Sequence, residues 1–376
     1  MKDRIVFFGG TFDPPHKEHI NIAKSASKYY SPDRFIVMPT AIPPHKDVFF
    51  SASANDRLNM CKIAFSEIEK LEVSDMEVKG GGKSYSYITI RKLKEKYPEA
   101  DIIFLMGSDM LRTFSEWKNP DDILKNCRLS LCEREGDESA EKTVSDFKEK
   151  YGMTVDVINY VGKNLSSTEY KISRMLGIKS DFVIKEVEDY IDLSGLYLPN
   201  EYFKFVKDNL TEKRLIHTKG VILSAIKISK KLGVDLYKTI TSAVLHDSAK
   251  YLDYRNYKDF VLPNGVPDSV IHQFLGAYVA EKILGVKDEE VLEAIKYHTS
   301  GKVGMGLLAK IIYVADMIED GREYDGVERL REVTYKNFDE GFKLCLKRTA
   351  DHLRESGKPI YEETLKAEQY YLKGEK

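Results

Sequence analysis

Residues 6–21, VFFGGTFDPPHKEHIN, decide the fold that we expect for the first half of the chain. An apolar run leads into Gly9 and Gly10, and His16 and His19 follow. Glycine allows the backbone to approach a ligand closely, and a helix N-terminus favours an anion. His16 and His19 lie three residues apart and therefore face one side of the first helical turn. The stretch predicts a strand, a phosphate-binding turn and a helix; a glycine turn with surface histidines is the alternative.

The segments after this stretch alternate between helix-like and strand-like patterns. We expect a helix at 18–30 and a loop at 39–46, and we expect further strands at 34–38, 72–78, 101–106, 128–132 and 155–160. Repeated strand–helix–strand units give a parallel sheet with helices on both faces, and such sheets bind ligands beyond the carboxyl ends of their strands. The sequence therefore predicts an α/β, Rossmann-like domain with one shared ligand site at that edge.

Residues 80–84, GGGKS, superficially resemble a P-loop. The P-loop motif needs a further glycine, and Glu77 occupies that position. We therefore do not expect a P-loop here.

The string GGTFDPPHKEH resembles the signature of the nucleotidyltransferases, and most closely that of the bacterial nicotinate-nucleotide adenylyltransferases. This resemblance implies transfer of AMP from ATP, with Mg²⁺, to nicotinate mononucleotide, and catalytic roles for His16, His19 and Lys46. Glu18 stands where the family signature has glycine. Its carboxylate would oppose close approach of phosphate unless it points away from the site.

The same resemblance implies a set of substrate-binding residues distributed over several loops. They are Gly9, Gly10, Thr11 and Phe12 in the first turn, His45 in PPHK, Tyr85 and Ser86 in SYS, Gly107 and Asp109 in GSD, then Trp117, Arg134, Ser166, Ser167, Thr168 and Lys171. By themselves, hydroxyls at a helix start are equally typical of caps, and Trp117 can be a core anchor. Lys171 replaces an arginine of the family motif, so we expect weaker triphosphate binding, with Arg174 as a substitute.

From about Leu198 onward the pattern becomes helical, and histidines recur on successive apolar segments. They are His217, His246 with Asp247, His272 and His298, and Asp316 lies within the apolar run KIIYVADMI. One such histidine is usually a core residue, but a series of them beside buried aspartates favours a divalent metal. Imidazole and carboxylate ligands suit iron, manganese, zinc or magnesium.

The strings HDSAK, YHTSG and VADMIEDGR resemble the HD superfamily, and most closely the bacterial hydrolases that split diadenosine tetraphosphate (Ap4A) into two ADP. This resemblance implies an all-α domain with metal ligands His217, His246, Asp247, His272, His298 and Asp316. Asp247 would bridge two metals and act in catalysis with Lys250, while Thr299, Gly301 and Arg322 would face the polyphosphate. The resemblance favours iron, with manganese as the alternative.

Length and charge are consistent with this organisation. A chain of 376 residues with 42% hydrophobic residues supports two domains, which we place at 1–197 and 198–376. The net charge of −2 argues against a general nucleic-acid surface. The four cysteines have no metal-like spacing, and neither a signal peptide nor a membrane span is apparent, so we expect a cytoplasmic protein. A homo-oligomer is compatible with this composition.

We therefore predict a bifunctional enzyme whose substrates are ATP, nicotinate mononucleotide and Ap4A. The alternatives are a pantetheine-phosphate or cytidylyl transferase in the first half and a nucleotide or cyclic-dinucleotide phosphohydrolase in the second. A third alternative is a non-catalytic first domain that senses nucleotide and regulates the hydrolase.

Overall fold

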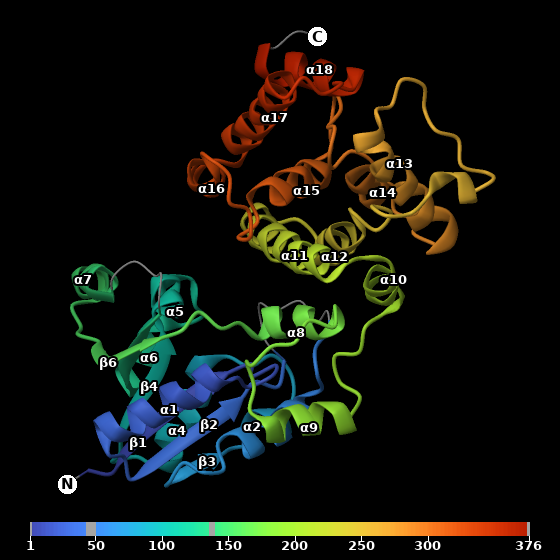
Figure 1. Cartoon of the computed structure of the whole chain (residues 1–376). Coiled ribbons are helices and arrows are strands. Elements are labelled where there is room, and N and C mark those ends of the chain that lie inside the picture. The colour runs from blue at the N-terminus through green and yellow to red at the C-terminus, as the bar shows by residue number, and fades with distance from the viewer. Residues whose placement is uncertain (1, 43–49, 135–139, 374–376) are drawn as a thin grey trace. The chain divides into compact units, whose positions relative to one another are not determined.

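The computed structural model describes residues 2–42, 50–134 and 140–373. They divide into two compact units (Figure 1). The first comprises the residues up to Lys171 together with Ser180–Tyr197, and the second comprises Ile172–Lys179 together with the residues from Leu198 onward.

The first unit is built on six parallel strands in the order β3-β2-β1-β4-β5-β6. The strands are β1 (Arg4–Gly10), β2 (Arg34–Pro39), β3 (Leu71–Val73), β4 (Asp101–Gly107), β5 (Arg128–Arg134) and β6 (Asp156–Gly162). Its helices are α1 (Lys17–Tyr30), α2 (Ala54–Ala64), α3 (Met76–Gly80), α4 (Ser86–Lys96), α5 (Ser108–Arg112), α6 (Pro120–Asn126), α7 (Ala140–Tyr151) and α9 (Lys185–Leu193). Helix α8 (Ser167–Met175) begins in this unit. The predicted α/β fold is confirmed.

Two apolar layers enclose the sheet. On one face, side chains of α1, α2 and α9 pack against alternate strand residues such as Val6 and Val37. On the other face, side chains of α4, α5, α6 and α7 cover residues such as Phe7 and Ile36. Because the central strands are buried on both faces, they appear in the sequence as continuous apolar runs.

The strand expected at 72–78 is shorter than predicted. β3 pairs with β2 only from Leu71 to Val73, and the chain then turns into α3. The backbone N–H of Ser74 donates to Val37 O, which ends the pairing, and the rest of the alternating pattern belongs to a helical turn. This edge position explains why the apolar signal is weak here.

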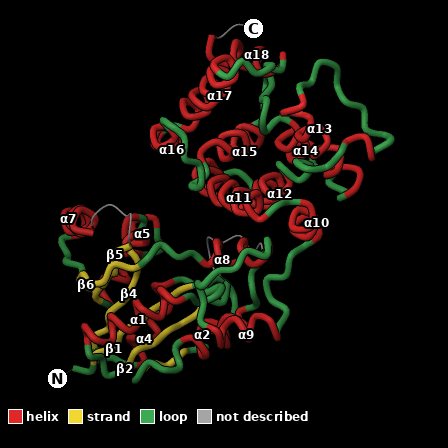
Figure 2. Tube along the Cα trace, viewed as in Figure 1, coloured by secondary structure: helices red, strands yellow, loops and turns green. Residues whose placement is uncertain are grey.

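The second unit is helical, and Figure 2 shows its described residues as helices and connecting loops. Its helices are α10 (Glu201–Asn209), α11 (Glu212–Leu232), α12 (Leu236–Leu245), α13 (Ile271–Tyr278), α14 (Glu289–Lys296), α15 (Leu307–Ile318), α16 (Val327–Lys336), α17 (Phe338–Glu355) and α18 (Glu362–Glu368). The predicted all-α second half is confirmed. Helix α15 lies at its centre, with residues such as Ile311, Ile312 and Val314 completely buried.

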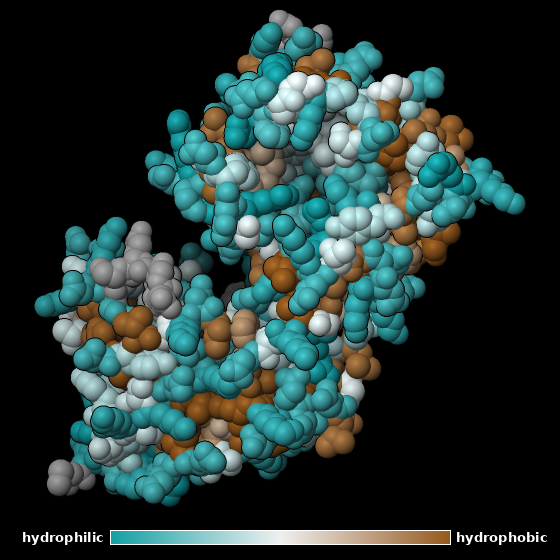
Figure 3. Space-filling view, in the orientation of Figure 1, coloured by the Kyte–Doolittle hydropathy of each residue, from teal (hydrophilic) through white to brown (hydrophobic). Residues whose placement is uncertain are grey.

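Hydrophilic side chains cover most of the face seen in Figure 3, with apolar side chains interspersed among them. Within the described ranges, no helix has both the length and the apolar character that crossing a bilayer requires.

Candidate active sites

The first candidate site lies where the strand order of the sheet reverses. β1 to β3 proceed toward one edge and β4 to β6 toward the other, so the carboxyl ends of β1 and β4 mark the point at which open α/β sheets bind ligands. Gly9 and Gly10 end β1 there, and Gly107 ends β4. A Cβ atom at Gly10 would lie 2.9 Å from the Phe12 ring, so any side chain at this position would have to displace that buried ring. The structure thus places the Gly-Gly turn at the predicted edge of the sheet.

His16 and His19 form a stacked pair at the start of α1. Their ring centroids are 3.6 Å apart, and the backbone N–H of His16 donates to Nδ1 of His19 over 3.0 Å. The His19 ring also meets the edge of Phe12. Since Nδ1 of a neutral His19 accepts this bond, its ring hydrogen resides on Nε2. Nε2 is therefore the atom through which His19 can donate to a phosphate oxygen.

Arg57 on α2 joins the loops that follow β1 and β2, a role that the sequence did not reveal. Its side chain is buried and donates to the carbonyls of Thr11 (2.9 Å) and Ala41 (2.7 Å). Burial lowers the pKa of Arg57, although the nearby Asp13 carboxylate opposes that shift. By satisfying the two carbonyls, Arg57 fixes the spacing between the two loops.

Lys171 is part of a buried ion pair, not an exposed phosphate ligand. Its Nζ lies 2.8 Å from Oδ2 of Asp13, and Asp13 is completely buried. The other Asp13 oxygen accepts from Ala52 N (3.0 Å) and Tyr197 Oη (2.8 Å). Burial raises the pKa of Asp13, but the Lys171 charge and these hydrogen bonds outweigh burial and hold the pKa below its ordinary value. Lys171 therefore anchors the Asp13–Pro14 turn.

The three hydroxyl residues of the SST motif lie at the start of α8. Ser166 Oγ accepts from the backbone N–H groups of Thr168 (3.2 Å) and Glu169 (3.4 Å), as a helix cap does. Ser167 Oγ donates to Pro14 O over 2.9 Å, which connects α8 to the first turn. Ser166 therefore acts as a helix cap, which is the alternative that the sequence left open. The cap uses the hydroxyl oxygen of Ser166 and does not need its hydroxyl hydrogen.

Glu18 points toward β6. Its carboxylate accepts from Tyr160 Oη, Lys163 N and Asn21 Nδ2, and its side chain is buried. A carboxylate held in this way does not point at the N-terminus of its own helix. Glu18 therefore points away from the site, which is what close approach of a phosphate requires.

The residues expected near the nicotinate group are placed on three elements. Tyr85 and Ser86 begin α4, and the preceding Ser84 accepts from Ala41 N over 2.9 Å. Asp109 is exposed at the start of α5. Trp117 is half-buried and packs against the rings of Phe104 and Phe114, as a core anchor would. His45, Lys46 and the side chain of Arg134 lie outside the described residues.

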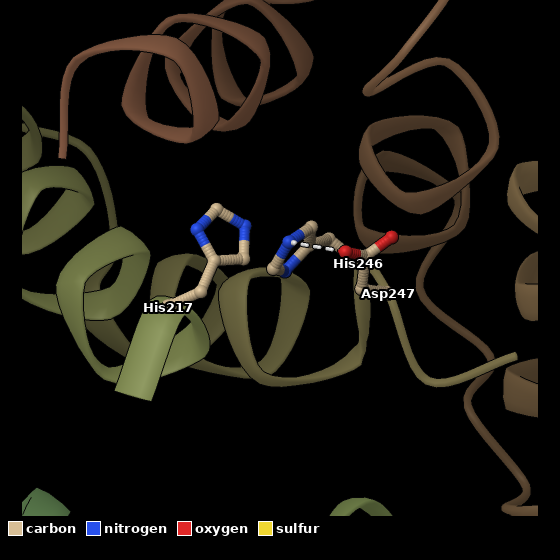
Figure 4. Close-up of side chains that lie close together, drawn as sticks. All are labelled: His217, His246 and Asp247. Carbon is tan, nitrogen blue, oxygen red and sulfur yellow. Dashed lines mark ion pairs between the residues drawn. The ribbon is translucent and has the colours of Figure 1, made fainter. Parts of the chain in front are cut away.

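The second candidate site gathers histidines and aspartates, most of them buried, from five parts of the helical unit. His217 lies on α11, His246 and Asp247 follow α12, His272 is on α13, His298 follows α14, and Asp316 is on α15. Figure 4 shows His217, His246 and Asp247 side by side. Two groups are arranged to hold a metal ion, namely His217–His246–Asp247 and Asp247–His272–His298. Asp247 belongs to both, as expected of a bridging ligand.

Hydrogen bonds set the tautomers of two of these histidines. His246 Nδ1 lies 2.7 Å from Ala243 O, and His298 Nδ1 lies 2.8 Å from Ile295 O. A carbonyl only accepts, so both Nδ1 atoms carry the hydrogen and both Nε2 atoms present lone pairs. His298 Nε2 lies 3.5 Å from Asp247 Oδ1 and 3.2 Å from His272 Nε2. Electron-pair donors converge in this way around a cation, so these residues fit a metal ion.

The protonation of the cluster also suits a metal. Burial lowers the pKa of His246 to about 3 and that of His272 to about 4, so both imidazoles are neutral at pH 7. Burial raises the pKa of Asp247, but the polar groups around its carboxylate outweigh burial and hold that pKa well below its usual range. Neutral imidazoles and an ionised carboxylate are the forms that bind metals.

Cationic and hydroxyl side chains surround the shared aspartate. Arg214 Nη1 lies 2.7 Å from Asp247 Oδ2, and Lys250 Nζ lies 3.5 Å from Asp247 Oδ1. Thr299 Oγ1 lies 3.2 Å from His272 Nε2. The structure thus brings Lys250 and Thr299 to the metal cluster, together with Arg214, which the sequence interpretation missed although it lies one helical turn before His217.

Two predicted polyphosphate-facing residues have other contacts. Arg322 Nη2 lies 2.5 Å from Asp316 Oδ1, and Arg322 Nε donates to the Asp316 backbone carbonyl. Gly301 is buried with a φ of +66°, and a Cβ atom there would lie 3.3 Å from Leu346. A left-handed turn against the apolar core explains this glycine.

Glu319 supports His217 from the side opposite the cluster. Its Oε1 lies 3.0 Å from His217 Nδ1, its Oε2 accepts from Gly321 N, and its side chain is buried. Nδ1 of His217 donates to Glu319, and Nε2, 3.0 Å from Asp316 Oδ1, is directed into the site. Burial lowers the pKa of His217, but these two carboxylates outweigh burial and raise it. One local feature could have indicated this role, namely an acid one turn after Asp316 at the end of the same apolar segment.

Comparison with known proteins matches a different family to each half of the chain. The cytidylyltransferase-like family model matches residues 7–195, and the HD domain model matches residues 214–321. A "Probable nicotinate-nucleotide adenylyltransferase/Ap4A hydrolase" of Mycoplasma genitalium is 28% identical over 363 residues, which cover 92% of this chain and 98% of that protein.

Two shorter proteins match one half each. The "Bis(5'-nucleosyl)-tetraphosphatase, symmetrical" of Bacillus subtilis is 35% identical over 176 residues, covering 45% of this chain and 95% of its own length. A "Probable nicotinate-nucleotide adenylyltransferase" of Aquifex aeolicus is 36% identical over 167 residues, covering 44% of this chain and 99% of its own length. Both predicted resemblances are confirmed.

Proposed function

We propose that this chain, which belongs to the cytidylyltransferase-like family in its first half and to the HD-domain family in its second, is a bifunctional enzyme. We assign AMP transfer from ATP to nicotinate mononucleotide to residues 1–197, and hydrolysis of Ap4A to two ADP to residues 198–376. The observation that carries the proposal is that each compact unit holds its own cluster of chemically suitable residues.

In the first reaction, a phosphate oxygen of nicotinate mononucleotide attacks the α-phosphorus of ATP. The new P–O bond forms as the bond to the β-phosphate breaks, and pyrophosphate leaves. Such transfers require positioning and charge stabilisation and no covalent intermediate. Mg²⁺ bound with ATP would supply further neutralisation of the phosphate charge.

We assign phosphate binding, ribose binding and positioning to different residues of the first unit. His19 Nε2 and His16 would donate to the phosphate oxygens beside the Gly9–Gly10 turn, where close backbone approach is available. Ser166 and Thr168 would contact the triphosphate at the start of α8, and Asp109 would accept from a ribose hydroxyl. Arg57 and Lys171 hold the loops and the Asp13–Pro14 turn that position these groups.

In the second reaction, water attacks a phosphoanhydride bond of Ap4A. The residues His217, His246, Asp247, His272, His298 and Asp316 would hold divalent metal, which when bound supplies a Lewis acid and an activated water. Nitrogen and oxygen ligands of this kind fit iron, our proposed metal, with manganese as the alternative. Lys250, Arg214 and Thr299 lie at the cluster and would neutralise and orient the polyphosphate.

Glu18 and Lys171 both depart from the family motifs, and these departures are the reason to consider a first unit that senses nucleotide without catalysis. Both side chains are engaged away from the anion site, Glu18 with the β6 side and Lys171 with Asp13. This arrangement supports catalysis over sensing. We further propose a cytoplasmic location, because the four cysteines are buried thiols without a disulfide.

The test is to incubate the purified protein with ATP, Mg²⁺ and, in parallel, nicotinate mononucleotide, nicotinamide mononucleotide or phosphopantetheine, and separately with Ap4A. We expect nicotinate adenine dinucleotide with pyrophosphate from the first set and ADP alone from Ap4A. A different acceptor would change the assigned specificity. Binding of ATP without any dinucleotide would establish the sensor, and AMP with ATP from Ap4A would refute symmetrical cleavage.

A further inference from the structure

Helix α1 is tied to strand β6 at both ends. Near the helix C-terminus, Tyr30 Oη donates to Asp156 Oδ2 at the start of β6 over 3.0 Å. Near the helix N-terminus, Glu18 Oε2 accepts from Tyr160 Oη (2.7 Å) and from Lys163 N (3.0 Å) at the end of β6. The second contact lies at the carboxyl edge of the sheet, where the site is.

Both oxygens of the Glu18 carboxylate accept hydrogen bonds. Its Oε1 accepts from Asn21 Nδ2 over 3.0 Å, so both oxygens are hydrogen-bonded in a side chain that is only 5% exposed. A buried carboxylate is costly unless it is satisfied in this way. The adjacent Gly162 leaves room for it, since a Cβ atom there would lie 3.1 Å from Glu18 Oε2.

The segment that Glu18 holds leads directly into the SST motif. Lys163, whose N–H binds Glu18, lies three residues before Ser166, and Lys163 O accepts from Leu165 N over 2.8 Å. Ser167 then binds Pro14 O, which lies in the same turn as the histidine pair. The loop between β6 and α8 is thus attached to the N-terminal side of the site at two points, Glu18 and Pro14.

We infer that Glu18 is a positioning residue for the transferase reaction: by fixing the β6–α8 loop to α1, it places Ser166 and Thr168 opposite His16 and His19. The inference rests on the proposed function, because it assigns the triphosphate of ATP to the start of α8. Glu18 itself contacts neither substrate. Its removal should therefore act on ATP and leave nicotinate mononucleotide largely unaffected.

The experiment compares Glu18→Ala, Glu18→Gln and the control Glu186→Ala, an exposed glutamate on α9. Misplacement of a binding group by about 1 Å costs on the order of 100-fold, so we expect the KM for ATP to rise about 10- to 100-fold in Glu18→Ala. The KM for nicotinate mononucleotide should stay near its wild-type value. Glutamine retains an oxygen for Tyr160 and Lys163, so Glu18→Gln should restore most of the ATP affinity.

Ap4A hydrolysis by the same protein serves as the internal control and should stay at the wild-type rate. If Glu18→Ala does not fold, Tyr160→Phe removes one of the three donors and should raise the KM for ATP in the same direction by a smaller factor. Calorimetric titration with a non-hydrolysable ATP analogue provides the binding readout without turnover.

Each outcome separates the inference from the proposed function. If the wild-type protein makes dinucleotide and the KM of Glu18→Ala for ATP is unchanged, the inference is wrong while the proposed function stands. Equal rises of both KM values, or a Glu18→Gln variant as defective as Glu18→Ala, also overturn it. A wild-type protein that binds ATP without making dinucleotide overturns the proposed function, and weaker analogue binding by Glu18→Ala would still support the placement of the loop.

Discussion

Replacing Lys171 by methionine should destabilise the first unit by about 3 kcal/mol at pH 7. The variant keeps the length of the side chain but leaves the completely buried Asp13 carboxylate without its cation. Removing one partner of a buried ion pair costs about 3–5 kcal/mol. We expect the lower end of that range because Asp13 retains its hydrogen bonds from Ala52 N and Tyr197 Oη.

The penalty should shrink as the pH falls. In the wild-type protein the pKa of Asp13 is lowered, so the stability contributed by its ionised form is complete above the ordinary value of 3.8 and is lost as the pH falls through the folded-state pKa. Without Lys171, burial raises that pKa instead, and a neutral Asp13 forms at higher pH. The difference between variant and wild type should therefore be smaller at pH 4 than at pH 7.

Urea unfolding followed by tryptophan fluorescence measures this difference. Trp117 is the only tryptophan of the chain and packs against Phe104 and Phe114, so its signal reports the first unit. Lys185→Met is the matched control, because Lys185 and Asp189 form an exposed pair, and exposed ion pairs contribute little to stability. A loss below about 1 kcal/mol in Lys171→Met, or a loss independent of pH, would refute the reasoning about buried ion pairs.

Two further substitutions test individual residues. Trp117→Ala should raise the KM for nicotinate mononucleotide more than that for ATP, by a factor equivalent to about 1–3 kcal/mol, if the ring stacks on the pyridine. Equal changes in the KM for nicotinate mononucleotide and the KM for ATP would contradict stacking. Trp117 would then be a core residue, as its packing against Phe104 and Phe114 indicates. Glu319→Gln should weaken metal binding about 10- to 100-fold, because it loosens the orientation of His217. Metal titration of the apo-protein measures this, and an unchanged affinity would argue against an orienting role.

Much of the fold could be predicted from local patterns. Buried parallel strands such as 101–106 are continuous apolar runs, and the histidines of the second unit recur at successive helix ends and faces, so both halves were identified correctly. The edge strand β3 was overextended because three paired residues carry little periodic information. The Gly-Gly turn and the first histidine pair were predictable because they are adjacent in the chain.

The contacts that the sequence did not reveal join residues far apart in the chain. Arg57 lies in an ordinary polar helix, and only the tertiary structure shows that its guanidinium satisfies carbonyls of two other loops. Lys171 and Asp13 are separated by 158 residues, and Glu18 and Lys163 by 145. A charged residue whose partner lies so far away in the chain has the same local pattern as a solvated one, so its role emerged only from the contacts.

The most direct test of two independent active sites in one chain is to assay both reactions on three preparations, namely wild type, His19→Ala and Asp247→Ala. Loss of one oriented donor typically costs about 10²- to 10³-fold in rate. We therefore expect His19→Ala to lose dinucleotide synthesis to that extent and keep Ap4A hydrolysis. Asp247→Ala should lose bound metal and ADP production while it keeps dinucleotide synthesis. If either folded variant loses both activities together, or if Asp247→Ala keeps its full metal content and still makes ADP, the two-site account is contradicted.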